Sequence, residues 1–174
     1  TIREFPLVCW TYTQARMTGY LTIVLTPDKE IMDDLFHEKG IPCVQTSNKP
    51  KNGSERCAEV LQLSLFDTID DDDIIINVQG DMVKFDHQCI PEMIRVLSEG
   101  KVEYVTAFSK LSDGNFLDPN RVKCTIQRTD KHGLVVCDFD RQPIPYRQNY
   151  LHIGIYGYIK KALNRYCEME PSFN

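Results

Sequence analysis

The sequence has 174 residues, a length that fits one domain with its own hydrophobic core. Hydrophobic residues make up 42%, charged residues make up 26%, and the formal net charge is -5, all ordinary values for a globular protein. Basic and acidic residues are interleaved and no long apolar span occurs, so we expect neither nucleic acid nor a membrane as a partner. A small anionic ligand is compatible with this charge distribution, because it needs only a few cationic side chains close to it.

The seven cysteines are spread almost evenly along the chain and show no spacing typical of a zinc site. Most of them lie within apolar segments. We therefore expect reduced, partly buried thiols in a cytoplasmic protein.

Apolar periodicity and turn residues predict alternating helices and strands in the first half of the chain. We expect a helix within 2–17, a strand at 21–25, a helix with Thr26 as its N-cap, a strand at 41–45, a helix from Ser54, and a strand that ends before Gly80.

The second half has a hairpin pattern. We expect a helix at 87–97, a strand at 104–108, a loop at 113–119, paired strands at 122–127 and 134–139, a strand at 151–159 and a helix at 160–167. The whole pattern predicts one α/β domain over 1–174 with a mixed sheet, in which 109–150 form a hairpin-bearing subregion.

The stretch from Asp73 to Asp81 is the centre of the predicted sheet. Three successive isoleucines suit a strand buried on both faces, as in the middle of a parallel sheet, and Gly80 then allows a sharp turn. Asp81 would follow the carboxyl end of this strand, where open α/β sheets bind ligands, and its carboxylate could hold a divalent cation beside a nucleotide phosphate. The stretch alone slightly favours the alternative, a plain strand-ending turn.

Two further segments contain candidate ligand contacts. Gly53, Ser54 and Arg56 lie where a polar loop enters a helix, so backbone N–H groups and a guanidinium could meet an anionic ligand; the alternative is a capping arrangement with an exposed arginine. In 152–158, His152 and Tyr156 share one strand face. The two glycines of this strand indicate a close ligand or backbone, and the alternative is an ordinary half-buried strand.

Five motifs occur in a familiar order: 52–56 (NGSER), 76–81 (INVQGD), 118–123 (DPNRVK), 144–146 (IPY) and 152–158 (HIGIYGY). Together they resemble the 3-deoxy-manno-octulosonate (Kdo) cytidylyltransferases, the CMP-Kdo synthetase family of lipopolysaccharide biosynthesis, over nearly the whole chain. The resemblance implies a Rossmann-like nucleotidyltransferase fold with a mixed, mostly parallel sheet and a small hairpin-bearing dimerisation part. It also implies a homodimer that converts CTP and Kdo to CMP-Kdo and pyrophosphate with Mg²⁺.

The resemblance assigns roles to the matching residues. Asp81 would be catalytic as the metal-binding carboxylate, and the CTP contacts would be Gly53, Ser54 and Arg56. The residues facing Kdo would be Gln79, Arg141, His152 and Tyr156.

The sequence departs from the family pattern in four places, one of which is a shorter stretch between Tyr146 and His152. A triphosphate-binding loop would precede Thr1, a second metal-binding Asp would follow Asn174, and Met82-Val83 stand where Glu-Pro is usual. We therefore expect the sequence to be part of a longer protein. The alternatives are a cytidylyltransferase for another acidic sugar, sialic-acid-like or amino-Kdo, and a non-catalytic nucleotide-binding homologue.

Overall fold

The structure is a computed structural model that describes residues 1–2 and 4–169. Its first elements are α1 (Leu7–Arg16), β1 (Val24–Thr26), α2 (Lys29–Asp33), a π-helical turn η1 (Asp34–Glu38), β2 (Cys43–Gln45), α3 (Gly53–Val60), a 3₁₀ turn η2 (Ser64–Phe66) and β3 (Ile74–Val78). The remaining elements are α4 (Cys89–Ser98), β4 (Tyr104–Lys110), α5 (Asp113–Phe116), β5 (Lys123–Thr129), β6 (Gly133–Asp140), β7 (Tyr150–Ile159) and α6 (Lys160–Glu168).

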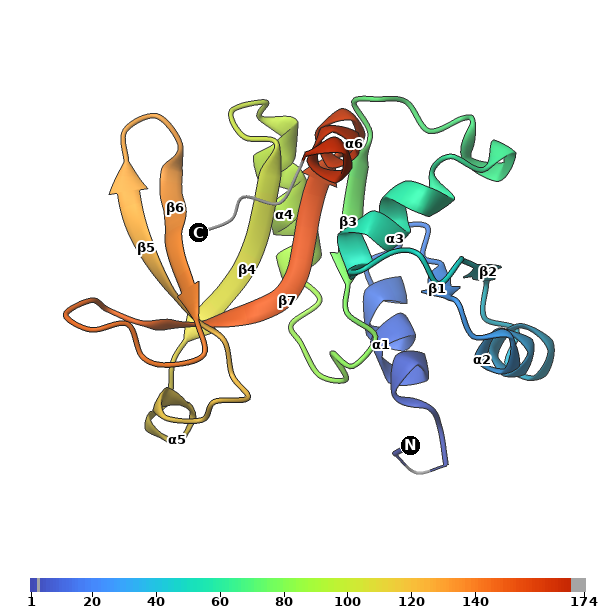
Figure 1. The fold of residues 1–174 in the computed structure, drawn as a ribbon, viewed down its shortest axis with the longest axis horizontal. Coiled ribbons are helices and arrows are strands. Elements are labelled where there is room, and N and C mark those ends of the chain that lie inside the picture. Colours follow the sequence, from blue (N-terminus) through green and yellow to red (C-terminus); the bar gives the residue numbers. More distant parts are fainter. Residues whose placement is uncertain (3, 170–174) are drawn as a thin grey trace.

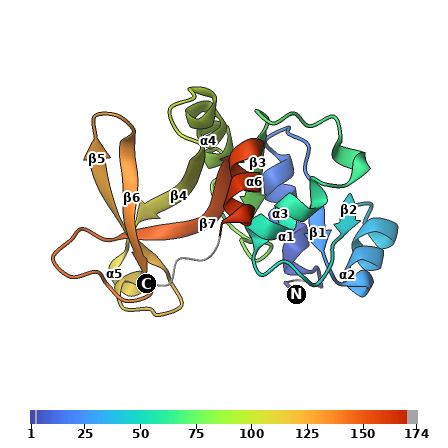
Figure 2. The same cartoon turned by 45° about the horizontal axis from the view of Figure 1, so that its top comes forward.

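Two sheets make up the α/β architecture (Figure 1). Strands β1 and β2 pair in parallel, whereas β3, β4 and β5 all pair with β7 in antiparallel orientation, and β6 pairs with β5. The β5–β6 hairpin projects at one end of the molecule, and β1 and β2 lie at the other end with α1, α2 and α3 (Figure 2). The expected α/β fold with a mixed arrangement is confirmed, but antiparallel pairing predominates among the described strands.

Strand β3 differs from its prediction as the middle of a parallel sheet. Within the described residues its pairing is with β7 alone, and every residue from Ile74 to Val78 is half-buried. The run of isoleucines correctly predicted that both faces of the strand contact apolar groups. The sequence pattern did not predict that the second edge of the strand borders a cavity instead of another paired strand.

Several helix boundaries differ from the sequence pattern. Helix α1 begins at Leu7 because Pro6 occupies its N-cap position. The cap of α2 is Asp28, whose carboxylate accepts from the N–H groups of Glu30 at 2.9 Å and Ile31 at 3.2 Å. Thr26, the expected cap, instead accepts from the Asp28 N–H. The loop expected at 113–119 contains the short helix α5.

The core joins the helices to β7. Tyr158 of β7 packs with Ala58 of α3 and Leu163 of α6, and all three are buried. The cysteines are unpaired in the structure; Cys9 and Cys124 are buried and Cys137 and Cys167 are exposed, so the sulfurs are partly buried as expected. No helix in the described part of the chain combines the length and apolar character needed to cross a membrane.

Gly157 is predicted to be required for packing. A Cβ at this position would lie 2.7 Å from Val105 Cγ2, 3.0 Å from Ile76 Cδ1 and 3.1 Å from Leu97 Cδ1. We expect Gly157→Ala to lower the free energy of unfolding by about 1–3 kcal/mol, measured by urea denaturation, because the added methyl group overpacks the core. The matched control Gly114→Ala adds the same methyl group where nothing lies within 4 Å. Equal effects of the two substitutions would contradict the packing argument.

Candidate active site

The amino end of α3 lies against β3. A Cβ on Gly53, the first residue of α3, would lie 2.7 Å from Nδ2 of Asn77. Asn52 caps the helix by accepting from the Glu55 N–H at 2.9 Å. A Cβ at position 53 would therefore displace the Asn77 amide, and the contact places the positive end of the α3 dipole beside the carboxyl end of β3.

Two side chains of α3 fix the helix in place. The hydroxyls of Ser54 and Tyr158 form a hydrogen bond of 2.5 Å, which ties α3 to β7. Arg56 is half-buried, and its Nη1 donates to Thr46 Oγ1 and to the Ser47 carbonyl at 3.2 Å. The alternative of a capping arrangement with an exposed arginine is therefore right about the cap, which Asn52 provides, and wrong about Arg56, whose guanidinium anchors the loop after β2.

Gln79 and Gly154 lie against each other. The Gln79 N–H donates to the Gly154 carbonyl at 3.2 Å, and a Cβ on Gly154 would lie 2.8 Å from Gln79 Cδ. Gly154 thus leaves room for a predicted substrate-facing side chain. The second glycine of β7, Gly157, makes room for core side chains, so the atoms nearest to both glycines belong to side chains, where the sequence indicated a ligand or another backbone.

Asp81 follows directly in the same loop. The hydroxyl of Thr11 on α1 donates to the Gly80 carbonyl at 2.9 Å and thereby fixes the loop, while the Asp81 side chain is exposed. Within the described residues no group of three or more His, Cys, Asp or Glu side chains gathers to hold a metal ion. A single carboxylate still fits Mg²⁺, which proteins commonly bind through one or two carboxylates together with substrate phosphates.

The hydrogen bonds of Thr106 determine the tautomer of His152. Thr106 Oγ1 lies 2.8 Å from the Ile155 carbonyl and 2.9 Å from His152 Nε2. A hydroxyl has one proton, and a carbonyl can only accept, so Thr106 donates to Ile155 and accepts from His152. The imidazole therefore carries its proton on Nε2, and burial lowers its pKa and keeps the ring neutral near pH 7.

His152 belongs to an aromatic cluster. Its ring centroid lies 5.4 Å from that of Tyr156 and 4.9 Å from that of Phe139 on β6. Burial raises the pKa of Tyr156, so its phenol keeps its proton and can donate a hydrogen bond. His152 and Tyr156 thus lie together on one face of β7, as the sequence alternation predicts.

Arg141 lies just beyond the end of β6. Its guanidinium is exposed and donates through Nη1 to the Pro119 carbonyl at 3.2 Å, and its own carbonyl accepts from Lys123 Nζ at 2.7 Å. Arg141 is therefore held by the hairpin part of the fold, directly after the strand that brings Phe139 to His152.

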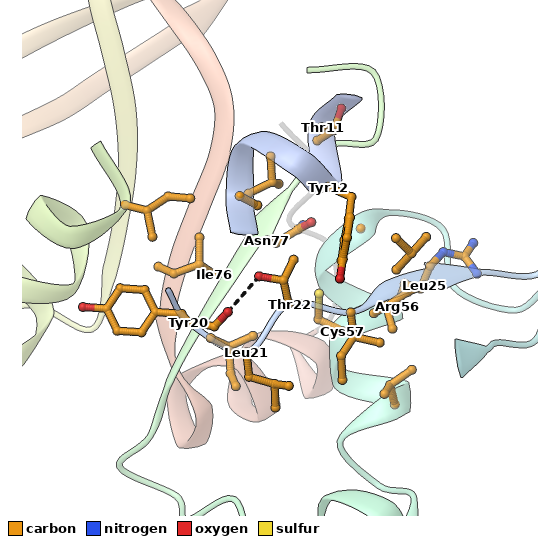
Figure 3. A pocket seen from close by; sticks show the side chains of 18 of the residues that line it. Thr11, Tyr12, Tyr20, Leu21, Thr22, Leu25, Arg56, Cys57, Ile76 and Asn77 are labelled. Atoms are coloured by element: carbon orange, nitrogen blue, oxygen red, sulfur yellow. Dashed lines mark hydrogen bonds between the residues drawn. The ribbon is translucent and has the colours of Figure 1, made fainter. Parts of the chain in front are cut away.

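A cavity of about 590 Å³ lies between β1, β3, α1 and α3 (Figure 3). Its walls are mainly apolar, and its polar lining includes Gly53, Arg56, Asn77 and Gln79. It therefore brings together three of the residues predicted from the sequence. The other five predicted residues do not line it: Ser54, Asp81, Arg141, His152 and Tyr156.

Comparison with known proteins shows the family to which the chain belongs. The family model described as "Cytidylyltransferase" matches residues 1–173. The chain belongs to the cytidylyltransferase family. The 3-deoxy-manno-octulosonate cytidylyltransferase of Chlamydia caviae is 35% identical over 157 residues, which are 86% of this chain and 58% of that protein. The corresponding Vibrio vulnificus protein is 30% identical over 96% of this chain and 69% of its own length.

A solved structure shares the fold. The structure titled as CMP:2-keto-3-deoxy-manno-octonic acid synthetase complexed with CTP matches with a TM-score of 0.79 and 24% identity, over 99% of this chain and 71% of that one. The present chain thus has a cytidylyltransferase fold and spans little more than half the length of its Chlamydia caviae relative.

Sequence reasoning about this cytidylyltransferase chain missed three polar residues that shape the site. They are Thr11 on α1, Asn77 on β3 and Thr106 on β4. Asn77 gave a signal, since it interrupts a β-branched run. The two threonines gave no signal, because a threonine within a helix or strand pattern is ordinary. The partner of Thr11 lies 69 residues away in sequence, and His152, the partner of Thr106, lies 46 residues away.

The neutral imidazole predicts a pH dependence of stability. Because the folded-state pKa of His152 lies below its ordinary value of 6.5, the unfolded chain binds a proton that the folded chain does not. The contribution of His152 to stability is present above about pH 6.5 and is lost as the pH falls. NMR titration should give a midpoint below 6.5 for His152 with the proton on Nε2. His152→Asn should remove this part of the pH dependence, and an unchanged pH dependence would contradict the assignment.

Proposed function

We propose that the protein transfers the cytidylyl group of CTP to Kdo and releases pyrophosphate. The observation that carries the proposal is the pairing of β3 with β7. It brings Gly53 at the start of α3 and Gln79, two residues before Asp81, next to the strand that bears His152 and Tyr156. Membership of the cytidylyltransferase family and the names of its relatives support the same reaction.

The amino end of α3 is the proposed CTP contact. The first intrahelical bond runs from the Arg56 N–H to the Asn52 carbonyl, so the N–H groups of Gly53 and Ser54 precede the hydrogen-bond ladder. Such groups bind phosphate or carbonyl oxygens. Because the Ser54 hydroxyl is engaged by Tyr158, Ser54 contributes its backbone, and Arg56 contributes the guanidinium N–H groups other than Nη1.

The face of β7 is the proposed sugar contact. The deprotonated Nδ1 of His152 accepts a hydrogen bond from a sugar hydroxyl, and the phenol of Tyr156 donates one. The Gln79 amide offers both a donor and an acceptor. Arg141 supplies the positive charge that suits the sugar carboxylate.

The reaction forms one bond and breaks another at the α-phosphorus. The anomeric hydroxyl of Kdo attacks this phosphorus and loses its proton to water, while the bond to the β-phosphate oxygen breaks and pyrophosphate leaves. These residues act by positioning the two substrates and by balancing charge. Asp81 would hold Mg²⁺ together with the substrate phosphates, and the bound ion supplies charge neutralisation at the α-phosphate.

The β5–β6 hairpin supports a homodimer. Leu134 and Phe139 on β6 are 52% and 53% exposed, and β6 lies at the end of its sheet order. An exposed apolar edge is a typical protein interface. The free thiols agree with a reducing compartment such as the cytoplasm, which we propose as the site of the reaction.

Loss of the Asp81 carboxylate tests the reaction most simply. We expect pyrophosphate release from CTP to require both Kdo and Mg²⁺, and Asp81→Ala to slow it by about 100-fold or more, because charge neutralisation at the phosphate is lost. The matched control Asp130→Ala, at the exposed hairpin turn, should keep full activity. Equal activity of wild type and Asp81→Ala would contradict the role of Asp81.

The choice of sugar is tested by substitution of the acceptor. The proposed arrangement predicts that Kdo supports faster pyrophosphate release than a sialic acid or amino-Kdo at equal concentration. Faster release with one of the other acidic sugars would reassign the substrate within the same reaction. No release with any of them, combined with measurable CTP binding, would indicate a non-catalytic nucleotide-binding homologue.

The dimer is tested by charging its proposed interface. Sedimentation velocity should give a dimer for the wild type and a monomer for Leu134→Glu, because a buried unpaired carboxylate at an apolar contact is unfavourable. Leu21→Glu, at an exposed leucine near β1, is the control and should stay dimeric. A monomeric wild type would exclude the proposed assembly.

A further inference from the structure

Lys123 on β5 has a fully buried ammonium group. The residue is 0% exposed, and its Nζ donates to the backbone carbonyls of Asp118, Arg121 at 2.9 Å and Arg141 at 2.7 Å. A lysine ammonium has three N–H groups, so each one has a carbonyl partner. A buried charge is tolerated only with such compensation, and a side chain with no free donor is not available to bind a ligand.

These contacts join segments that are separate in sequence. Asp118 and Arg121 belong to the loop before β5, and Arg141 follows the end of β6. The backbone of Lys123 also pairs with Asp140 of β6 and with Leu151 of β7. One side chain therefore fixes the meeting point of β5, β6, β7 and the preceding loop.

This meeting point adjoins the proposed sugar contacts. The His152 N–H donates to the carbonyl of Val122, the residue before Lys123, at 2.9 Å. The Arg141 guanidinium donates to Pro119 in the same loop. A shift of the loop would therefore move the backbone next to His152 and remove a partner of the Arg141 side chain.

We propose that Lys123 is a positioning residue for the sugar site. Its ammonium acts as an internal cation that draws three carbonyl oxygens together and so sets the spacing between Arg141 and His152. This spacing determines how an acidic sugar is held between a guanidinium and a neutral imidazole. We call the three hydrogen bonds from Lys123 Nζ to the carbonyls of Asp118, Arg121 and Arg141 the carbonyl clamp. The inference that this clamp affects sugar binding rests on the proposed function, whereas the existence of the clamp does not.

Hydrogen–deuterium exchange of the full chain tests the clamp without any ligand. Lys123→Met removes the charge and keeps an unbranched apolar side chain. We expect exchange at 118–122, 141–142 and 152 to accelerate about tenfold or more, with α1 unchanged. Lys131→Met, at an exposed lysine of the hairpin turn, is the matched control and should exchange like the wild type. Unchanged exchange at these three segments in Lys123→Met would overturn the clamp.

Steady-state kinetics then test the positioning role. Lys123→Met should raise KM for Kdo by about tenfold or more and leave KM for CTP within about twofold, because the nucleotide contacts lie on α3. Lys123→Gln, which restores part of the donor set, should recover part of the loss and also serves if Lys123→Met fails to fold. Equal increases in both KM values would indicate a general structural defect and overturn the proposal. If the wild type were inactive with every acidic sugar, the proposed function would be refuted. The exchange experiment would still show whether Lys123 holds these segments together.

Discussion

The pairing of β7 with three other strands is the constraint on which the rest of the structure depends. β3, β4 and β5 all hydrogen-bond to this one strand, and the pairing with β4 shifts between Thr106 and Ala107. At this irregularity Thr106 bonds to the Ile155 carbonyl and to His152. Bulges of this kind redirect side chains next to functional sites. The same short stretch thus sets the tautomer of the histidine and its place in the aromatic cluster.

The packing around β7 links fold stability to the arrangement of the site. Tyr158 belongs to the core, yet its hydroxyl also bonds to Ser54 at the start of α3. Burial raises the pKa of Tyr158 to about 12, so its phenol keeps its proton and this bond stays intact over the physiological pH range. Gly53 in turn lies against Asn77 on β3. Core, helix terminus and strand end therefore form one connected set of contacts, and few of them can change independently.

The sequence predicted the order and type of most elements, because their periodicity and turn residues are local signals. It predicted less about strand pairing, since β3 was expected to be a central parallel strand. A β-branched run indicates apolar surroundings but does not indicate the direction of the neighbouring strand. In the site, Gly53 was singled out because a polar loop enters a helix there, and Gln79 was assigned only through the resemblance of its motif to the family. Thr106 and the burial of Lys123 were not foreseen, because their significance depends on carbonyl groups brought near only by the fold.

We propose that the β3–β7 pairing holds the nucleotide contacts of α3 next to the sugar contacts of β7 for a single transfer reaction. The most direct measurement is a crystal structure of the protein in complex with CMP-Kdo. We expect the cytidylyl group at the amino end of α3 beside Gly53 and Arg56, with the sugar carboxylate at Arg141 and a sugar hydroxyl on His152. Product bound away from β7, or with the cytidylyl group distant from α3, would contradict it.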